Sequence, residues 1–387
     1  MKFLVSIHYF PPHIGGMETL VQKQAESLSA KGHEVTVLTC RHDAKLPLHE
    51  QAKGYAIRRL RALNFVETKL GMALPLVSPF LLIRMLKQVD DYDVIHIHDV
   101  YYPLSQLIFL AALIRKKPFY LTQHVAIVDH PSRLVRGVQS IIHKTIGKAM
   151  YKRAKSIVVY NVNVRKYLFD LGVDKTKIVL NHNGINTAFF APATVNEAQK
   201  LRRKYCLPLD RPIVLFVGRL IPEKGYDLVF DCQSADYLTI IVGGGAVPKR
   251  MKNARHVHFF GSASQSELRD LYRLSNLFVF PAAVEIFALV MQEAMACGLP
   301  VITANNPHYR HYGLNNHLFR QIPRTKKALK SEVAFLLADP QLQRKMSDYS
   351  RALAVERFSW GRNYAHEYAI YDLRQTGWSV DTAPEAA

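Results

Sequence analysis

The sequence holds 387 residues, enough for two domains of ordinary size, and its 49% hydrophobic and 10% aromatic content excludes a disordered chain. Its four cysteines are far apart and form no C-x-x-C pair, so neither a disulfide framework nor a zinc site is indicated. A net charge of +20 is typical of proteins that bind nucleic acids. The sequence has no zinc-finger spacing, RNP-like motif or arginine-rich tail, so we expect no nucleic-acid partner.

The first residues, MKFLVSIHYFPP, place one lysine before a short apolar run that meets two prolines. This pattern predicts a first strand rather than a signal peptide. The sequence contains no uninterrupted run of about 18 apolar residues, which argues against a membrane span. Because the cysteine usage also fits a reducing compartment, we expect a cytoplasmic protein, either free or peripheral at the inner face of the plasma membrane.

Apolar runs alternate with helical patterns along the first half of the chain, and the alternation starts again in the second half. The predicted strands are, in chain order, Phe3–His8, Val35–Thr39, Ala56–Leu60, Val94–His98, Phe119–Gln123, Ser156–Tyr160, Ile178–Asn181, Pro212–Val217, Leu238–Val242, His256–Phe260, Leu277–Phe280 and Val301–Thr303. We therefore expect an α/β fold with two doubly wound parallel sheets, in Rossmann-like domains at 1–190 and 191–361. The linker is expected near 186–210. Ligands bind outside the carboxyl ends of such strands, so two facing domains form a cleft lined by these loops.

Two glycines, Gly15 and Gly16, follow the first strand and precede a helix that is predicted to begin near Met17. Glycine lets the backbone pass close to a ligand, and a helix N-terminus supplies N–H donors for a phosphate. Glycine pairs also make ordinary tight turns, so this pattern alone is a weak indication of a binding site.

Histidines close two later strands of the first half. His98 and His124 are the residues at these ends, so both side chains are expected in the cleft, whereas His96 lies one step inward and is expected to be structural. A D-x-D pattern at Asp91 and Asp93 precedes its strand and so lies at the opposite end. We therefore predict no metal requirement.

The segment Arg133–Lys155 carries seven basic residues and no acidic one. It belongs to a more basic first half, in which residues 1–190 hold 26 Lys and Arg against 13 Asp and Glu. Its apolar residues recur at roughly helical spacing and are Leu134, Val138, Ile141, Ile142, Ile146, Ala149 and Met150. Such a helix either lies on an anionic lipid surface or packs on the core with a basic outer face, and the sequence leaves both open.

The second half opens with a strand that runs directly into the loop GRLIPEKG. Gly218, Arg219 and Lys224 therefore lie at the carboxyl end of that strand. Two fixed cations in this position can neutralise the charge that builds on a departing nucleoside diphosphate, although either one alone is more often a surface cation.

The next strand ends in three glycines, which raises the possibility of a dinucleotide-binding loop. With Gly243 and Gly245 in the first two places of G-x-G-x-x-G, the last place is held by Pro248, so the fingerprint fails. The glycines remain candidates for close approach of the backbone to a ligand.

The most informative segment is EIFALVMQEAMACGLPV, residues 285–301. Glu285 is expected on the loop that leaves a buried strand, and Glu293 on a helix that opens after Phe287 and stops at Gly298. The free N–H groups of that helix would point back at the loop, where a phosphate or sugar hydroxyl can be held. A carboxylate such as Glu293 can accept hydrogen bonds from a diol.

Three patterns, P-x-x-G-G, G-R-x4-K-G and E-x7-E, occur in the order seen in family 4 glycosyltransferases, which are retaining enzymes with the GT-B fold. The chain resembles this family from about Phe3 to about Trp360. The resemblance implies roles for residues of each loop. Gly15 and Gly16 would approach the diphosphate of the donor, and Gly218 would also bind the donor. Arg219 and Lys224 would assist the departure of the diphosphate, and Gly243 and Gly245 would lie beside the nucleotide.

The resemblance also implies that Glu285 bonds the donor sugar and Glu293 the ribose hydroxyls. His124 would touch the donor sugar or the acceptor hydroxyl, and His98 is a weaker candidate on the acceptor side. The N–H groups of Phe287, Ala288 and Leu289 would meet sugar or phosphate oxygens. Ala288 departs from the glycine that is usual there, which leaves the identity of the donor open. A last helix near 362–380 would return to the first domain.

We therefore expect a retaining, metal-independent glycosyltransferase that needs no cofactor. Its donor would be a UDP- or GDP-sugar and its acceptor a hydroxyl of a glycan or lipid-linked molecule, in polysaccharide, lipopolysaccharide or glycolipid synthesis. An epimerase or phosphorylase of the same fold is one alternative. A non-catalytic protein that binds sugar nucleotides or a membrane surface is another, although the full set Arg219, Lys224, Glu285 and Glu293 argues for catalysis.

Overall fold

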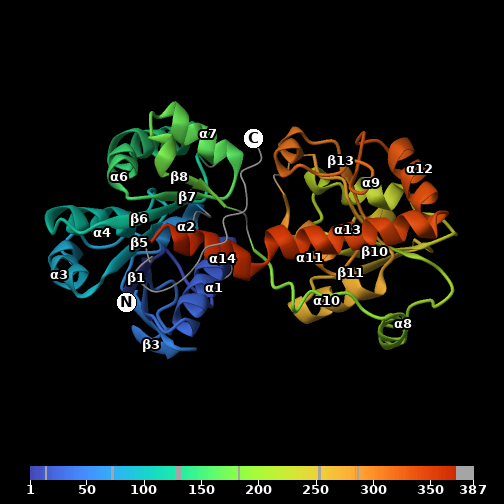
Figure 1. Ribbon diagram of the computed structural model, residues 1–387, viewed down its shortest axis with the longest axis horizontal. Coiled ribbons are helices and arrows are strands. Elements are labelled where there is room, and N and C mark those ends of the chain that lie inside the picture. Colours follow the sequence, from blue (N-terminus) through green and yellow to red (C-terminus); the bar gives the residue numbers. More distant parts are fainter. Residues whose placement is uncertain are drawn as a thin grey trace. The chain divides into compact units, whose positions relative to one another are not determined.

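The computed structural model describes residues 1–13, 15–70, 74–127, 132–181, 184–251, 254–283, 285 and 287–371. The chain divides into two units, each with helices around a central sheet (Figure 1). Unit 1 comprises Met1–His182 and Tyr364–Ala387, and unit 2 comprises Asn183–Asn363. The stretch 186–210, which we expected to be a linker, therefore lies in unit 2.

The sheet of unit 1 has eight strands in the order β3-β4-β2-β1-β5-β6-β7-β8. Their bounds are β1 (Lys2–Ser6), β2 (Glu34–Cys40), β3 (His49–Ala52), β4 (Tyr55–Leu60), β5 (Val94–His98), β6 (Phe119–Gln123), β7 (Ile157–Val159) and β8 (Ile178–Leu180). All neighbours pair in parallel except β3 and β4. The central strands are buried throughout, as a parallel sheet covered on both faces requires.

The edge strand β3 was not predicted from the sequence. Its residues, HEQA, are polar and mostly exposed, so they lack the apolar run by which the other strands were recognised. It joins β4 through a two-residue turn in which Lys53 and Gly54 have φ of 42° and 88°. Two consecutive positive φ values are typical of the turn that suits the twist of a hairpin.

The helices of unit 1 are α1 (Gly16–Ala30), α2 (Phe65–Leu70), α3 (Leu81–Gln88), α4 (Pro103–Ile114), α5 (Arg133–Ile142), α6 (Lys148–Arg153) and α7 (Val162–Asp170). A π-helical segment at His143–Gly147 joins α5 to α6. A π turn holds an extra residue and rotates the faces on either side of it against each other. The apolar stripe predicted for this segment is therefore split, because Val138 and Ile141 are exposed whereas Met150 is buried.

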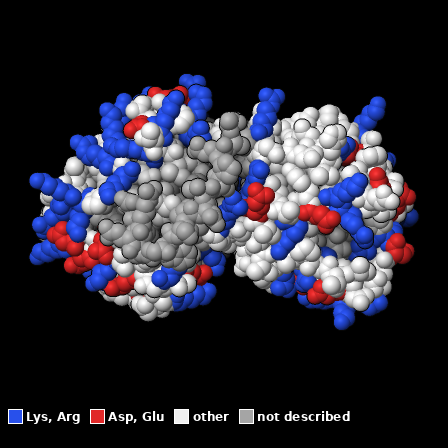
Figure 2. Space-filling model, viewed as in Figure 1, with Lys and Arg blue, Asp and Glu red and all other residues white. Residues whose placement is uncertain are grey.

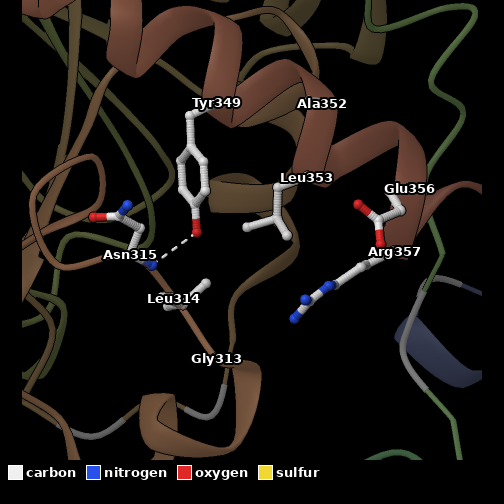
Figure 3. Close-up of a pocket in the computed structure, with 8 residues that line it drawn as sticks. All are labelled: Gly313, Leu314, Asn315, Tyr349, Ala352, Leu353, Glu356 and Arg357. Atoms are coloured by element: carbon white, nitrogen blue, oxygen red, sulfur yellow. Dashed lines mark hydrogen bonds between the residues drawn. The ribbon is translucent and has the colours of Figure 1, made fainter. Parts of the chain in front are cut away.

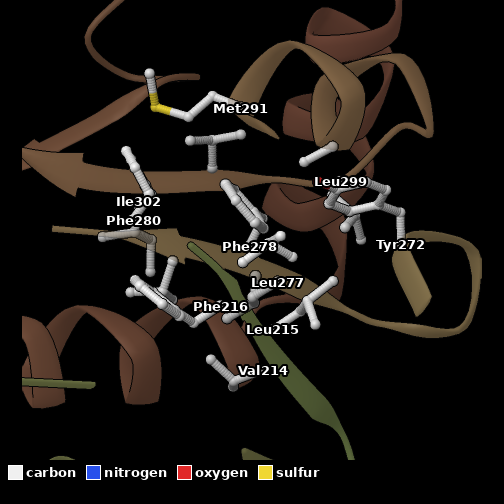
Figure 4. Packing of buried hydrophobic residues seen from close by; sticks show 14 of the residues in the cluster. Val214, Leu215, Phe216, Tyr272, Leu277, Phe278, Phe280, Met291, Leu299 and Ile302 are labelled. Atoms are coloured by element: carbon white, nitrogen blue, oxygen red, sulfur yellow. The ribbon is translucent and has the colours of Figure 1, made fainter. Parts of the chain in front are cut away.

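The sheet of unit 2 has six parallel strands in the order β11-β10-β9-β12-β13-β14. Their bounds are β9 (Ile213–Val217), β10 (Leu238–Val242), β11 (Val257–Gly261), β12 (Leu277–Phe280), β13 (Val301–Ala304) and β14 (Arg320–Ile322). Phe216, Phe278 and Phe280 stack from β9 and β12 into the core beneath Met291 (Figure 4). The short edge strand β14 is largely polar and was not predicted.

The helices of unit 2 are α8 (Val195–Lys204), α9 (Tyr226–Asp231), α10 (Gln265–Leu274), α11 (Leu289–Ala296), α12 (Lys326–Leu337), α13 (Pro340–Phe358) and the start of α14 (Trp360–Ala369). Both α8 and α10 open with a capping box, formed by Thr194 with Glu197 and by Ser264 with Glu267. The last helix, expected at 362–380, ends at Ala369, and residues 372–380 lie outside the described part of the chain.

Candidate active site

Lys224 and Glu285 form the centre of the site in unit 2. Lys224 ends a 3₁₀ turn (Pro222–Lys224) that follows β9, and Glu285 follows β12. Because β9 and β12 are parallel neighbours, their carboxyl ends bring the two loops together. Lys224 Nζ lies 2.5 Å from Glu285 Oε2, and the two side chains are 22% and 21% exposed. This partly exposed ion pair can present a cation to an anionic ligand and carboxylate oxygens to a hydroxyl.

The two loops are fastened by backbone contacts and by one arginine. Gly225 has φ of +82°, and a Cβ there would lie 2.5 Å from the carbonyl oxygen of Pro281, so the approach requires glycine. Arg324 donates to the carbonyl oxygens of Pro281 and Pro222, at 2.9 and 2.6 Å. Arg324 follows the unpredicted strand β14, which is why no local pattern singled it out.

A second pair of loops meets at the ends of β9 and β10. The N–H of Gly218 donates to Val242 O at 2.9 Å, and the N–H of Leu220 donates to Gly244 O at 3.0 Å. Gly243 has φ of +151°, and a Cβ on it would lie 1.8 Å from Gly218 O. Close packing of the two loops therefore explains Gly243, and Arg219 is exposed on the loop that this packing supports.

Gly245, like Gly243, is required by the close packing of the two loops. Its φ is +136°, and a Cβ there would lie 2.8 Å from Leu220 Cβ. The G-x-G turn thus serves the contact between the two loops, and it sets their backbone beside Arg219.

Helix α11 begins and ends as predicted. Ala288 is its N-cap, with extended backbone at φ −62° and ψ 140°, and Gly298 lies beyond its end with φ of +76°. The side chain of Phe287 is buried against Tyr309 and Tyr312, so Phe287 can offer a ligand only its main chain. The first N–H groups of a helix have no partner within it, and here they belong to residues from Leu289 onward.

Glu293 is partly buried on α11. The hydroxyl of Tyr272 donates to Glu293 Oε2 at 3.0 Å. Burial raises the pKa of Glu293 to about 7, against an opposing effect of the Tyr272 hydrogen bond. The raised pKa favours the protonated carboxyl group, which can lose its proton when hydroxyl donors bind it.

Gly15 and Gly16 open α1 in unit 1, with Gly15 as an N-cap of extended backbone. A Cβ on Gly15 would lie 2.1 Å from Glu18 Oε2, so the Glu18 carboxylate packs directly against this loop. Glu18 is buried and lies 2.6 Å from His13 Nδ1. The structure therefore places the His13–Glu18 pair beside these glycines, a pairing that the sequence did not indicate.

The structure brings His98 and His124 together at the ends of β5 and β6. His98 Nδ1 lies 3.0 Å from His124 Nε2, and His98 Nε2 lies 3.0 Å from Gln24 Oε1. His98 is fully buried and His124 is partly exposed. Burial lowers the pKa of His124 to about 3, so its ring is neutral at physiological pH. His96 faces inward onto Thr122 at 2.7 Å, as predicted for a structural residue.

Asp91 and Asp93 lie at the start of β5, as the sequence indicated, and Asp93 accepts a hydrogen bond from the N–H of Lys2. Within the described residues, the structure contains no group of three or more His, Cys, Asp or Glu side chains arranged to hold a metal ion. Within the same residues, no helix has the length and apolar character that crossing a membrane requires.

A cavity of about 310 Å³ lies elsewhere in unit 2, between residues 313–315 and helix α13 (Figure 3). Tyr349 accepts a hydrogen bond from the N–H of Asn315 at its edge, and Arg357 bonds the carbonyl oxygen of Tyr312. None of the residues predicted for the site lines this cavity, so we do not assign it to catalysis.

Comparison with known families identifies both halves of the chain. The model of "Glycosyltransferase Family 4" matches residues 14–189, and that of "Glycosyl transferases group 1" matches residues 197–353. An uncharacterized glycosyltransferase of Methanocaldococcus jannaschii is 27% identical, over 79% of this chain and 80% of that protein. The D-inositol 3-phosphate glycosyltransferase of Acidothermus cellulolyticus is 28% identical, over 78% and 74%.

Solved structures agree on the fold. Sucrose-phosphate synthase of Thermosynechococcus elongatus has a TM-score of 0.73 at 22% identity, covering 97% of this chain and all of that one. HepE of Anabaena, solved with UDP, has a TM-score of 0.72 at 18% identity, with the same coverage. The two parallel sheets are thus those of the GT-B fold, and the chain belongs to the family 4, group 1 glycosyltransferases.

Proposed function

We propose that this glycosyltransferase moves a sugar from a UDP- or GDP-sugar to a hydroxyl of a glycan or lipid-linked acceptor, with retention of the anomeric configuration. The observation that carries the proposal is the Lys224–Glu285 pair at the carboxyl edge of the second sheet. HepE of Anabaena, which shares the fold, has been solved with UDP and with UDP-glucose, and this supports a uridine donor.

Charge stabilisation in the proposed reaction comes from side chains. As the bond to the sugar breaks, negative charge grows on the diphosphate, and Arg219 and Lys224 neutralise it together with the N–H groups at the start of α11. With these cations in place, neither a metal ion nor a cofactor has a task in the mechanism. Activity that is lost strictly with a chelator would contradict this part of the proposal.

Retention follows if the acceptor attacks on the face from which the diphosphate leaves. The leaving phosphate oxygen then takes the proton of the acceptor hydroxyl. Glu285 is already engaged by Lys224, which suits it to hold a sugar hydroxyl rather than to form a covalent intermediate. Glu293 would hold the ribose diol, Gly243 and Gly245 would flank the nucleotide, and His124 would contact the sugar.

The test is to incubate the protein with a panel of UDP- and GDP-sugars and a mixture of glycan and lipid-linked acceptors, and to measure release of the nucleoside diphosphate. We expect release from one donor class that depends on acceptor, with a product whose anomeric configuration matches the donor by NMR. Inversion would refute retention. Binding of a diphosphate without any transfer would favour the alternative of a non-catalytic binding protein.

We further propose that the protein acts at the inner face of the plasma membrane, on an acceptor carried by anionic lipid. On α5, Val138 and Ile141 are 43% and 62% exposed, and Lys144 is exposed in the following turn. Lys and Arg also gather over the α4, α6 and α7 side of unit 1 (Figure 2). Each basic residue near anionic headgroups contributes about 1 kcal/mol. WaaG, a neighbour in fold, is described as involved in lipopolysaccharide biosynthesis.

Co-pelleting with phosphatidylserine-containing vesicles tests the membrane proposal. The double variant Val138→Ser, Ile141→Ser should lose most of the binding, because the exposed apolar contact is removed. Val355→Ser is the matched control, since Val355 is 42% exposed on α13 of unit 2 and should leave binding unchanged. Equal pelleting of all three proteins, or none by the wild type, would contradict the proposal.

A further inference from the structure

A continuous chain of polar side chains in unit 1 runs inward from His124. His124 Nε2 is 3.0 Å from His98 Nδ1, and His98 Nε2 is 3.0 Å from Gln24 Oε1. Gln24 Nε2 donates to the hydroxyl of Tyr371 at 3.2 Å, and that hydroxyl contacts His96 Nδ1. Segments far apart in the sequence, from α1 to the segment after α14, thus meet behind one partly exposed histidine.

The amide of Gln24 determines which groups donate and which accept along this series of hydrogen bonds. The structure orients the carbonyl oxygen of Gln24 toward His98 Nε2, and in this amide orientation the oxygen can only accept, so His98 Nε2 carries the proton. The NH₂ group of Gln24 donates to the hydroxyl of Tyr371 at 3.2 Å, and His96 Nδ1 lies farther from it, at 3.5 Å. The hydroxyl of Tyr371 then donates to His96 Nδ1, and His96 Nε2 donates to Thr122 at the end of the chain.

The state of His98 follows from its surroundings. The ring is fully buried and stacks on two other imidazoles, with centroids 4.7 Å from His96 and 5.3 Å from His124. Burial therefore holds its pKa well below the ordinary value, and the ring is neutral. A neutral imidazole that donates from Nε2 can only accept at Nδ1, so His124 must donate to it from Nε2.

Stacking contacts hold the ring of His124 in place. It stacks between His98 and Tyr160, with centroids 5.3 and 5.6 Å away. Its Nδ1 has no protein partner among the residues that the structure describes. With the proton on Nε2, Nδ1 is left as a lone pair that can accept a hydrogen bond but cannot donate one.

We propose that His98, anchored by Gln24 and Tyr371, is a positioning residue that locks His124 in the Nε2–H tautomer, so that His124 Nδ1 accepts a hydrogen bond from a hydroxyl of the donor sugar. This inference rests on the proposed glycosyl transfer for its consequence in turnover, but the tautomer itself is a property of the protein alone. Orientation of a neutral histidine by a partner on its other nitrogen is a general way of fixing which nitrogen reacts.

The experiment is ¹⁵N NMR of the full chain labelled in histidine, with His98→Leu and His98→Asn as the variants. In the wild type at pH 7, we expect His124 to be protonated on Nε2 and bare on Nδ1. His98→Leu removes the acceptor, so His124 should become a mixture of tautomers. His98→Asn keeps an acceptor oxygen near the position of Nδ1 and should restore the single tautomer. The backbone spectrum of each variant reports whether it is folded.

Kinetics give the second readout. We expect His98→Leu to lower kcat by about tenfold or more with KM for the donor changed by less than about threefold, and His98→Asn to recover most of the loss. A wild-type His124 protonated on Nδ1, or an unchanged tautomer in His98→Leu, would overturn the proposal. Because the NMR arm needs no substrate, a correct tautomer without any sugar transfer would refute the proposed function and leave the role of His98 standing.

Discussion

The contact between Lys224 and Glu285 holds a cation in place at the candidate active site. An ammonium group that lies 2.5 Å from a carboxylate is positioned by it, and both groups keep about a fifth of their surface exposed, so a ligand can still reach them. Arg324 and Gly225 hold the two supporting loops, which keeps the cation in place before substrate binds. Preorganised charge of this kind is worth most when negative charge develops during the reaction.

Replacing Lys224 by alanine removes that charge. We expect Lys224→Ala to lower kcat by roughly 10²–10³, the scale observed when one charge-stabilising donor is removed. Steady-state kinetics measures this loss of kcat, with the donor that the sugar-nucleotide panel identifies. Lys166→Ala is the matched control, since Lys166 forms an exposed ion pair with Asp170 and should leave kcat unchanged. Near-normal turnover in Lys224→Ala would remove the site from the mechanism.

Glu293 supplies a prediction about pH. Its pKa is raised from 4.5 to about 7, so the folded state holds a proton that the unfolded state has lost. Its contribution to stability is full below about pH 4.5 and is lost as the pH rises through 7. Ribose hydroxyls instead favour the charged carboxylate. Nucleoside diphosphates should therefore bind more tightly as the pH rises from 6 to 8, by less than tenfold per pH unit.

The variant Glu293→Gln separates these two effects. It should bind the diphosphate more weakly, flatten the pH dependence of Kd measured by calorimetry, and gain thermal stability relative to the wild type above pH 7. A variant that keeps the pH dependence of the wild type would show that another group is responsible.

At the scale of elements, the site residues that follow buried parallel strands could be predicted from the sequence. Buried apolar runs predicted β5, β6, β9 and β12. The end of β5 at His98 and the loops that hold His124, Lys224 and Glu285 were therefore found from the sequence. Edge strands β3 and β14 were missed because their residues are polar and only partly covered. Arg324, Gln24 and Tyr371 were missed with them, since each acts through a contact with a segment distant in the sequence, and no local pattern encodes such contacts.

The contact between the β9 and β10 loops gives a prediction at this scale. Gly243→Ala would force a methyl group against Gly218 O in a backbone conformation that L-residues rarely adopt. We expect a loss of about 2 kcal/mol or more of unfolding free energy, seen as a lower midpoint in chemical denaturation. Gly244→Ala is the control, because its φ is not positive and its nearest contact is the Ser262 hydroxyl at 3.2 Å. Equal midpoints for the two variants would contradict the packing argument.

At the scale of the whole molecule, two units with separate cores share one chain that leaves unit 1 near residue 182 and returns to it at Tyr364. The GT-B fold and the family are established by both halves of the chain. We expect the donor base, the sugar and the acceptor to depend on the shapes of loops such as the one at Ala288. Its extended backbone suits any residue, so alanine there changes the space available rather than the fold.

Thermal stabilisation of the whole chain by UDP, GDP and other nucleoside diphosphates tests the central claim most directly. A ligand at about 100 times its Kd stabilises a folded protein by roughly 2.7 kcal/mol. We expect one of UDP and GDP to raise the melting temperature of the wild type clearly, and Glu293→Gln to respond less at the same concentration. A wild type whose melting temperature is unchanged by every nucleoside diphosphate would contradict the assignment of this site to a nucleotide-sugar donor.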